Sequence, residues 1–121
     1  MVRAIRGAIT VENNTREEIL EATAELLKEI FDKNDIDRES LIEMIFTLTP
    51  DLNAVFPAVA ARHMGITNVP LMCMSEIPVE GALKKCVRVL LQMNTDKKLD
   101  DINHVYLKGA TVLRPDLVQK K

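Results

Sequence analysis

Two arginines set in apolar, strand-like segments are the residues of this 121-residue chain best suited to chemistry. Arg88 stands within Val87-Arg88-Val89-Leu90-Leu91, and Arg6 interrupts the apolar run over residues 2–9. Removing a guanidinium from water costs about several kcal/mol, so each arginine needs a counter-charge. That counter-charge is either an acid of the protein or an anion that binds and leaves. The two arginines together predict a pocket for a small organic acid.

The composition is that of one globular domain spanning residues 1–121. Hydrophobic residues make up 47% and charged residues 28%, which is ordinary for a soluble domain. The net charge is −2, basic residues are scattered, and aromatics are only 3%. A nucleic-acid partner is therefore not expected, because such proteins present a basic face and stacking aromatics.

Neither a membrane partner nor a metal is expected. No apolar run approaches the roughly 18 residues of a membrane span. No secretory signal is visible after Met1, so a cytoplasmic protein is predicted. Cys73 and Cys86 are too few and too far apart for a zinc site, and His63 and His104 stand alone.

The pattern of elements predicts an α+β fold, a mixed β-sheet with covering helices. A capping box from Thr15 to Glu18 begins a helix that runs to about Lys33. Pro57 and Gly65 bracket a second helix. Strands are expected over residues 2–12, 41–48, 69–76, 87–91 and 104–113, with Gly109 at a bulge or tight bend. Residues 86–95 are long enough for a helix, but β-branched neighbours of Arg88 favour a strand.

Two further features follow from this order of elements. A short, flexible polar tail is expected from about residue 115. A two-layer domain leaves the outer sheet face bare, so oligomerisation is expected to cover it.

Segments along the whole chain, in order and at similar spacing, resemble the monofunctional chorismate mutases of the Bacillus type. They are Arg6-Gly7-Ala8, Thr49-Pro50-Asp51-Leu52, Ala54-Val55-Phe56-Pro57-Ala58, Cys73-Met74, Glu76, Leu83-Lys84-Lys85-Cys86-Val87-Arg88-Val89, His104-Val105-Tyr106-Leu107 and Leu113-Arg114-Pro115-Asp116-Leu117. The resemblance implies a homotrimer of pseudo-α/β-barrel appearance with active sites between subunits. It also implies cofactor-free conversion of chorismate to prephenate in phenylalanine and tyrosine biosynthesis.

The resemblance also implies roles for four catalytic residues. Arg88 would face the ether oxygen of chorismate and a substrate carboxylate. Arg6 would hold the side-chain carboxylate, assisted by the Tyr106 hydroxyl. Glu76 would accept a hydrogen bond from the ring hydroxyl, with Cys73 near it.

Other residues would bind the substrate or line its cleft. Arg62 and Arg114, near the mouth, would attract the ring carboxylate. Family members often carry a lysine at the position of Val59 and a threonine at that of Met72, so altered substrate affinity is expected here. The residues expected to form the wall are Phe56, Ala58, Leu71, Met72 and Leu113.

Other interpretations stay open at this point. Arg88 and Glu76 alone are as well explained by a structural ion pair in the core. A non-catalytic trimeric module that binds a small organic acid also needs arginines, and so does another small-acid enzyme on a trimeric fold, such as an imine deaminase. Arg88, Glu76 and Tyr106 together favour the mutase, since a simple anion trap does not need all three.

Overall fold

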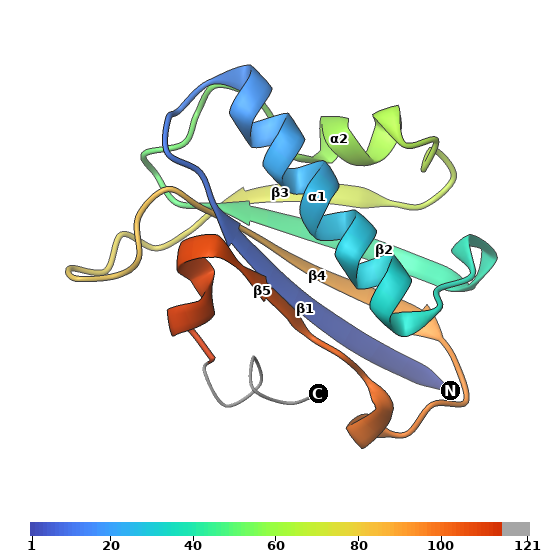
Figure 1. Ribbon diagram of the computed structural model, residues 1–121. Helices are drawn as coiled ribbons and strands as arrows, with labels where there is room; N and C mark the ends of the chain where they lie inside the picture. The colour runs from blue at the N-terminus through green and yellow to red at the C-terminus, as the bar shows by residue number, and fades with distance from the viewer. Residues whose placement is uncertain (115–121) are drawn as a thin grey trace.

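The chain folds into one mixed five-stranded sheet covered on one face by two helices (Figure 1). A computed structural model describes residues 1–114. The strands and helices are β1 (Val2–Thr10), α1 (Arg16–Asn34), β2 (Leu41–Leu48), α2 (Ala58–His63), β3 (Leu71–Ser75), β4 (Cys86–Asn94) and β5 (Val105–Leu107). The predicted fold class and the predicted order of elements are both confirmed.

The sheet order is β3-β2-β4-β1-β5. β4 lies at the centre and runs antiparallel to β1 and β2, its two neighbours. The outer pairs, β1 with β5 and β2 with β3, are parallel. Arg88, the third residue of β4, is therefore carried by a strand that is hydrogen-bonded on both sides.

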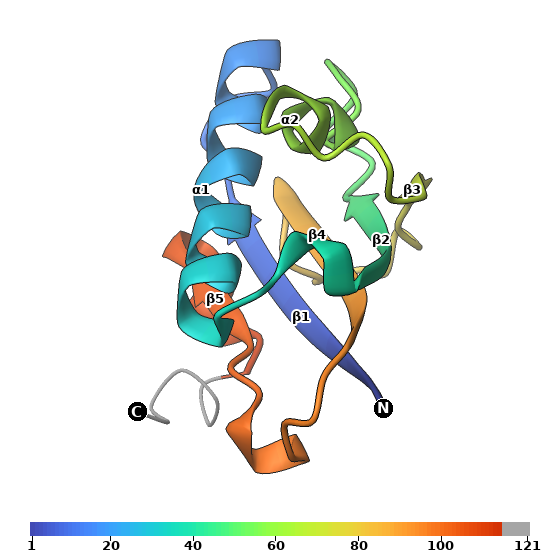
Figure 2. The same ribbon diagram turned by 90° about the vertical axis from the view of Figure 1, so that its right-hand side faces the viewer.

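Alternation along the strands divides the sheet into two unlike faces. In β4, Val87, Val89 and Leu91 are buried against the helices. α1 supplies the matching apolar stripe, which includes Leu26 and Ile30. Successive strand side chains point to opposite faces, so the residues between these core positions face away from the helices. Figure 2 shows α1 lying along one side of the sheet.

The start of α1 follows the predicted capping box with one change. The Thr15 hydroxyl accepts a hydrogen bond from the backbone N–H of Glu18 at 3.2 Å. The Glu18 carboxylate accepts from the N–H of Asn13 at 3.1 Å, two residues before the cap. The side chain of Glu18 therefore also secures the turn that leads from β1 into the helix.

The last predicted strand, over residues 104–113, is wrong beyond Leu107. Residues Lys108–Val112 form a 3₁₀ helix, which begins with Lys108 at φ 53°. The Gly109 N–H donates to the Thr10 hydroxyl at 2.9 Å, and a Cβ on Gly109 would lie 2.9 Å from that oxygen. Gly109 thus marks a close approach of two segments, and the predicted tail from about residue 115 lies outside the described residues.

The outer face of the sheet carries several exposed apolar side chains in the single chain. Val2, Met72, Met74 and Leu90 expose 50%, 58%, 44% and 36% of their surface. Exposed apolar patches of this kind mark interaction surfaces. The homotrimer nevertheless stays a prediction. Among the helices of residues 1–114, none has the length and apolar character needed to span a membrane.

Gly7 sets the distance between α1 and the sheet. A Cβ at this position would lie 2.7 Å from Cδ1 of Ile30 and 3.2 Å from the Val105 carbonyl oxygen. We expect Gly7→Ala to lower the free energy of unfolding by about 1–3 kcal/mol, because overpacking forces neighbouring atoms to move. Urea denaturation measures this loss.

Ile30→Val provides the matched test, because it removes the atom that a methyl group at position 7 would strike. The double variant Gly7→Ala/Ile30→Val should be more stable than the sum of the two single losses predicts. Strictly additive losses would contradict the close contact between Gly7 and Ile30.

Candidate active site

Arg88 lies in a row of side chains that crosses the outer face of the sheet. Thr47 of β2 pairs with Arg88, and Met74 of β3 pairs with Thr47. On the other side Ala8 of β1 pairs with Arg88, and Tyr106 of β5 pairs with Ala8. Ala8 is the smallest of the five, so it leaves Arg88 and Tyr106 room above it. The sheet register thus brings together residues from all five strands.

Glu76 is the acid that meets Arg88. The Arg88 Nε lies 3.1 Å from the Glu76 Oε2, with 27% and 16% of the two side chains exposed. The Thr47 hydroxyl donates to the same carboxylate oxygen at 2.5 Å, and the Glu76 N–H donates to the Leu48 carbonyl at 2.8 Å. Glu76 is therefore held in place from both its side chain and its backbone.

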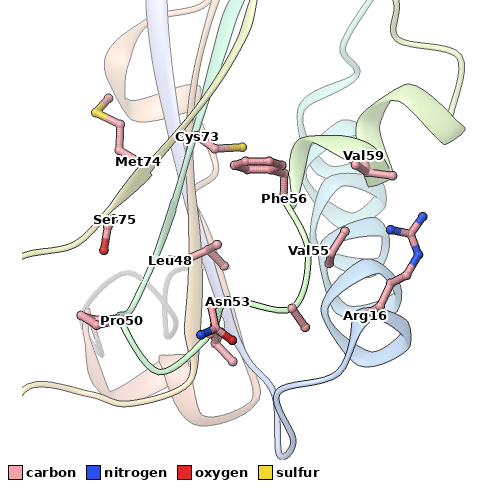
Figure 3. Close-up of a pocket in the computed structure, with 12 residues that line it drawn as sticks. Arg16, Leu48, Pro50, Asn53, Val55, Phe56, Val59, Cys73, Met74 and Ser75 are labelled. Atoms are coloured by element: carbon pink, nitrogen blue, oxygen red, sulfur yellow. The ribbon is translucent and has the colours of Figure 1, made fainter.

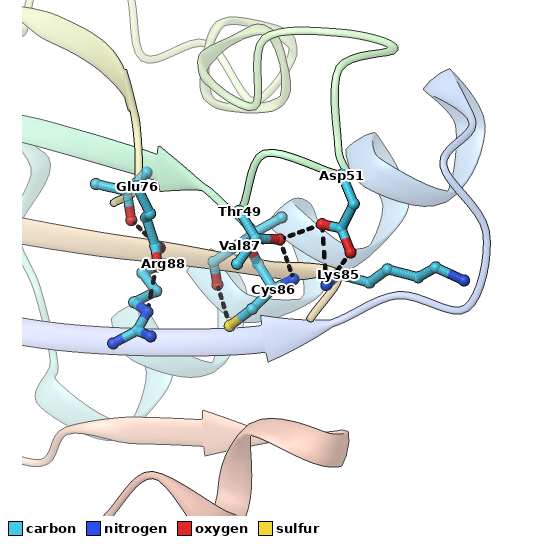
Figure 4. A network of polar contacts seen from close by, with 8 residues as sticks. Thr49, Asp51, Glu76, Lys85, Cys86, Val87 and Arg88 are labelled. Carbon is cyan, nitrogen blue, oxygen red and sulfur yellow. Dashed lines mark hydrogen bonds and ion pairs between the residues drawn. The ribbon is translucent and has the colours of Figure 1, made fainter. Parts of the chain in front are cut away.

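The Arg88 guanidinium is not fully satisfied by this pair. Its Nε is buried and makes an ion pair but no hydrogen bond of good geometry within residues 1–114. Figure 4 shows its two terminal nitrogens turned away from Glu76. The cation thus keeps donors for a further anion.

Arg6 shares a depression of about 520 Å³ with Arg88 and Glu76. Arg6 is exposed on β1, two residues from Ala8 on the same face. The remaining lining is mostly apolar, which strengthens the electrostatic effect of the charged groups. It consists of Ile45, Thr47, Met74, Ser75, Ile77, Val89 and Leu90.

Tyr106 belongs to a small buried cluster on this same outer face. It is 6% exposed and packs with Ala8, Cys86 and Ala110, while Leu113 packs against the cluster from outside. Its hydroxyl is buried and has no hydrogen-bond partner within residues 1–114. A buried hydroxyl without a partner is uncommon, so the Tyr106 hydroxyl is a candidate donor to a bound molecule.

The Cys86 thiol also lies beside Arg88. Burial raises the pKa of this thiol to about 11, because the low-dielectric surroundings disfavour the thiolate. The charge of Arg88 acts in the opposite direction but does not offset burial. Cys86 therefore remains neutral and does not cancel the charge of Arg88.

A polar network fixes the entry into β4, two residues before Arg88 (Figure 4). Lys85 adopts a left-handed conformation with φ 51°, and its N–H donates to both carboxylate oxygens of Asp51. The Thr49 hydroxyl donates to Asp51 and accepts from the N–H of Cys86 at 3.0 Å. The loop before α2 therefore sets the register of the strand that carries Arg88.

A second pocket of about 560 Å³ lies on the other side of β3 (Figure 3). Phe56 and Cys73, both predicted to bind substrate, line it. Met74 and Ser75 line both this pocket and the depression around Arg88. The backbone of β3 thus separates the two halves of the predicted site within one chain.

The remaining predicted binding residues are dispersed. Ala58 is buried in the main core, and Leu71 packs against that core. Met72 is exposed on the outer face. Arg62 on α2 and Arg114 after the last 3₁₀ helix are exposed, and neither lines the depression around Arg88.

Two residues that touch the central ion pair were not predicted from the sequence. Thr47 holds Glu76, and its signal was a lone hydroxyl residue in the apolar strand of residues 41–48. Cys86 lies beside Arg88, but its sequence context indicated only a small buried residue. Within the described part of the chain, no cluster of three or more His, Cys, Asp or Glu side chains is arranged to hold a metal.

The geometry agrees with what comparison with known proteins finds. The chain matches the family model for chorismate mutase type I over residues 2–117. It is 51% identical to chorismate mutase AroH of Bacillus subtilis over 97% of this chain and 93% of the relative. It is 52% identical to chorismate mutase AroH of Thermus thermophilus over 97% of each chain.

The fold agrees as well. A solved chorismate mutase from Clostridium thermocellum superposes with a TM-score of 0.89 at 55% identity. The match covers 91% of this chain and 98% of the solved chain. Sequence and fold agree over nearly the whole length, and the chain belongs to the type I chorismate mutase family.

Proposed function

We propose that this chorismate mutase converts chorismate to prephenate by holding the dianionic substrate against Arg88 in a cleft shared by two subunits. The reaction is an intramolecular [3,3] rearrangement, in which a C–O bond breaks as a C–C bond forms. No proton has to move and no nucleophile is needed. The protein therefore has two tasks, to restrain the flexible enolpyruvyl arm and to stabilise charge on the ether oxygen.

Arg88 is the residue assigned to the ether oxygen. Glu76 holds the Nε side of its guanidinium, and the terminal nitrogens point away from that carboxylate. A fixed cation directed at an oxygen that gains charge binds the transition state more tightly than the ground state. This arrangement, a preorganised cation with free donors in a mostly apolar depression, is the observation that carries the proposal.

The neighbouring polar groups fit the rest of the substrate. The Tyr106 hydroxyl, which has no hydrogen-bond partner within residues 1–114, and the exposed Arg6 guanidinium would hold the side-chain carboxylate. The Glu76 carboxylate, which accepts from Thr47, has a second oxygen for the ring hydroxyl. Each substrate group would then meet a residue of opposite charge or a hydrogen-bond partner, and no cofactor is required.

Two features support a cleft shared between subunits of a homotrimer. Phe56 and Cys73 line a pocket on one side of β3, while Arg88 lines a separate depression on the other side, so the residues expected around one substrate do not share a pocket within one chain. The exposed apolar side chains of the outer face, Met72 and Leu90 among them, would be buried by assembly. Localisation in the cytoplasm stays a prediction.

Loss of chorismate absorbance with the purified protein tests the role of Arg88. We expect Arg88→Lys and Arg88→Ala to lower kcat by at least about 10²–10³-fold, since an ammonium group does not reproduce the planar guanidinium. Arg38→Lys is the matched control, because Arg38 lies over the Phe31 ring and donates to the Met64 carbonyl. It should retain normal turnover.

Near wild-type activity of Arg88→Lys would contradict the role at the ether oxygen. If the unaltered protein binds chorismate without turning it over, the non-catalytic binding module becomes the better description.

Mixing two inactive variants tests the shared cleft. Arg88→Ala disables one wall, and Phe56→Asp places a carboxylate in the other, where it repels the dianion. Random assembly of equal amounts gives mixed trimers in about three quarters of cases. Each mixed trimer has one cleft whose two walls are both unaltered, out of three clefts. About a quarter of wild-type activity should therefore return. An inactive mixture, or an active species sedimenting at the 13.6 kDa chain mass, would refute the shared cleft.

The raised pKa of the Cys86 thiol predicts how the stability of the fold changes with pH. Below pH 9 the thiol is protonated in folded and unfolded chains alike, so it adds no pH dependence. Between pH 9 and about 11 only the unfolded chain ionises, so stability falls through this window. The gap in Tm between wild type and Cys86→Ala should therefore narrow as pH rises from 8 to 10.5.

Cys73→Ala is the matched control, since it removes a thiol and leaves Cys86 in place. A gap for Cys86→Ala that stays constant with pH would show that the buried thiol ionises normally.

A further inference from the structure

The pocket that contains Phe56 has one charged residue among the twelve that line it, and that residue is Arg16. The other lining side chains are apolar or neutral, among them Val59 and Cys73. Figure 3 shows the Arg16 side chain extending from the start of α1 toward Val59 of α2. No hydrogen bond or ion pair of its guanidinium occurs within residues 1–114. A free cation therefore lies at the edge of a neutral pocket.

The position of Arg16 relative to the pocket is fixed by its neighbours. The Asn14 side-chain oxygen accepts from the backbone N–H groups of Asn53 and Ala54, at 3.0 Å and 3.2 Å. The Asn14 side-chain nitrogen donates to the Asn53 side chain at 2.7 Å. The segment that leads into α1 is thus tied to the loop that carries Phe56, and Thr15 caps the helix between them.

The positive charge of Arg16 does not stabilise α1, the helix that carries it. Arg16 is the first residue of α1, where the positive end of the helix dipole prefers an acid. Glu17 and Glu18 meet that preference in the same turn. Arg16 therefore supplies a positive charge to the pocket from a position where an acid would stabilise the helix more.

We propose that Arg16 is a substrate-binding residue that attracts and holds a carboxylate of the dianionic substrate at the mouth of the Phe56 pocket. The proposal rests on the proposed function, because it takes this pocket as one wall of the cleft. Val59, on the facing helix, offers the substrate no charge, so Arg16 supplies the cation on this wall. A carboxylate remote from the breaking bond carries the same charge throughout the reaction, so Arg16 would bind ground and transition states equally.

Steady-state kinetics of Arg16→Gln test this assignment. We expect KM to rise about fivefold at low ionic strength, as loss of one solvent-exposed charge pair predicts, with kcat unchanged. The rise should shrink in 0.5 M salt, since screening weakens exposed charges. Arg16→Glu should raise KM further and leave Tm equal or higher, because the helix gains a favourable first-turn charge.

Two further variants separate this role from a general effect of charge. Lys28→Gln changes the net charge equally on an exposed position of the same helix and should leave KM unchanged. Val59→Lys in the Arg16→Gln background returns a cation to the same pocket and should restore most of the lost affinity.

The possible results are distinct. Unchanged KM in Arg16→Gln, a fall in kcat alone, or an equal rise in KM for Lys28→Gln would each overturn the assignment. Calorimetric titration with prephenate, which is also a dianion, measures the contribution of Arg16 to binding affinity without turnover. If the unaltered protein does not turn over chorismate but binds prephenate, and Arg16→Gln binds prephenate more weakly, the proposed function is overturned. The assignment of Arg16 as a carboxylate-binding residue is still supported.

Discussion

The partial burial of the Arg88 charge next to the Glu76 carboxylate is the constraint on which the site depends. A guanidinium on the central strand is tolerated because Glu76 lies at 3.1 Å and because Thr47 and the Leu48 carbonyl hold Glu76 in turn. Cys86, kept neutral by burial, adds no second counter-charge. Glu76 therefore offsets the cost of partly burying the Arg88 charge, and the terminal nitrogens of Arg88 remain available to bind an anion.

Most helices and strands could be predicted from local sequence patterns, because the spacing of apolar residues reflects which side chains pack in the core. The helix cap at Thr15 and the strand over residues 41–48 depend on neighbours close in sequence, and both formed where they were expected. The end of the last strand did not, because the close approach of Gly109 to Thr10 joins segments about a hundred residues apart. No local pattern reports such a contact.

The candidate site was predictable to a similar degree and for a similar reason. Arg88 drew attention because a charge among valines and leucines contradicts its surroundings, whereas Thr47 looked ordinary and gained meaning only from its bond to Glu76. Arg16 was equally inconspicuous, since an arginine in a charged helix start is typical of a surface. Residues whose role arises from strand register or from a neighbouring helix need the structure to be recognised.

The shared lining of the two pockets bears on how this sequence can diverge. Met74 and Ser75 of β3 border the depression around Arg88 on one side and the Phe56 pocket on the other. A substitution at either position changes the lining of both pockets at once. Selection therefore acts on its combined effect on the two pockets. This short edge strand should therefore drift more slowly through evolution than its exposure alone suggests.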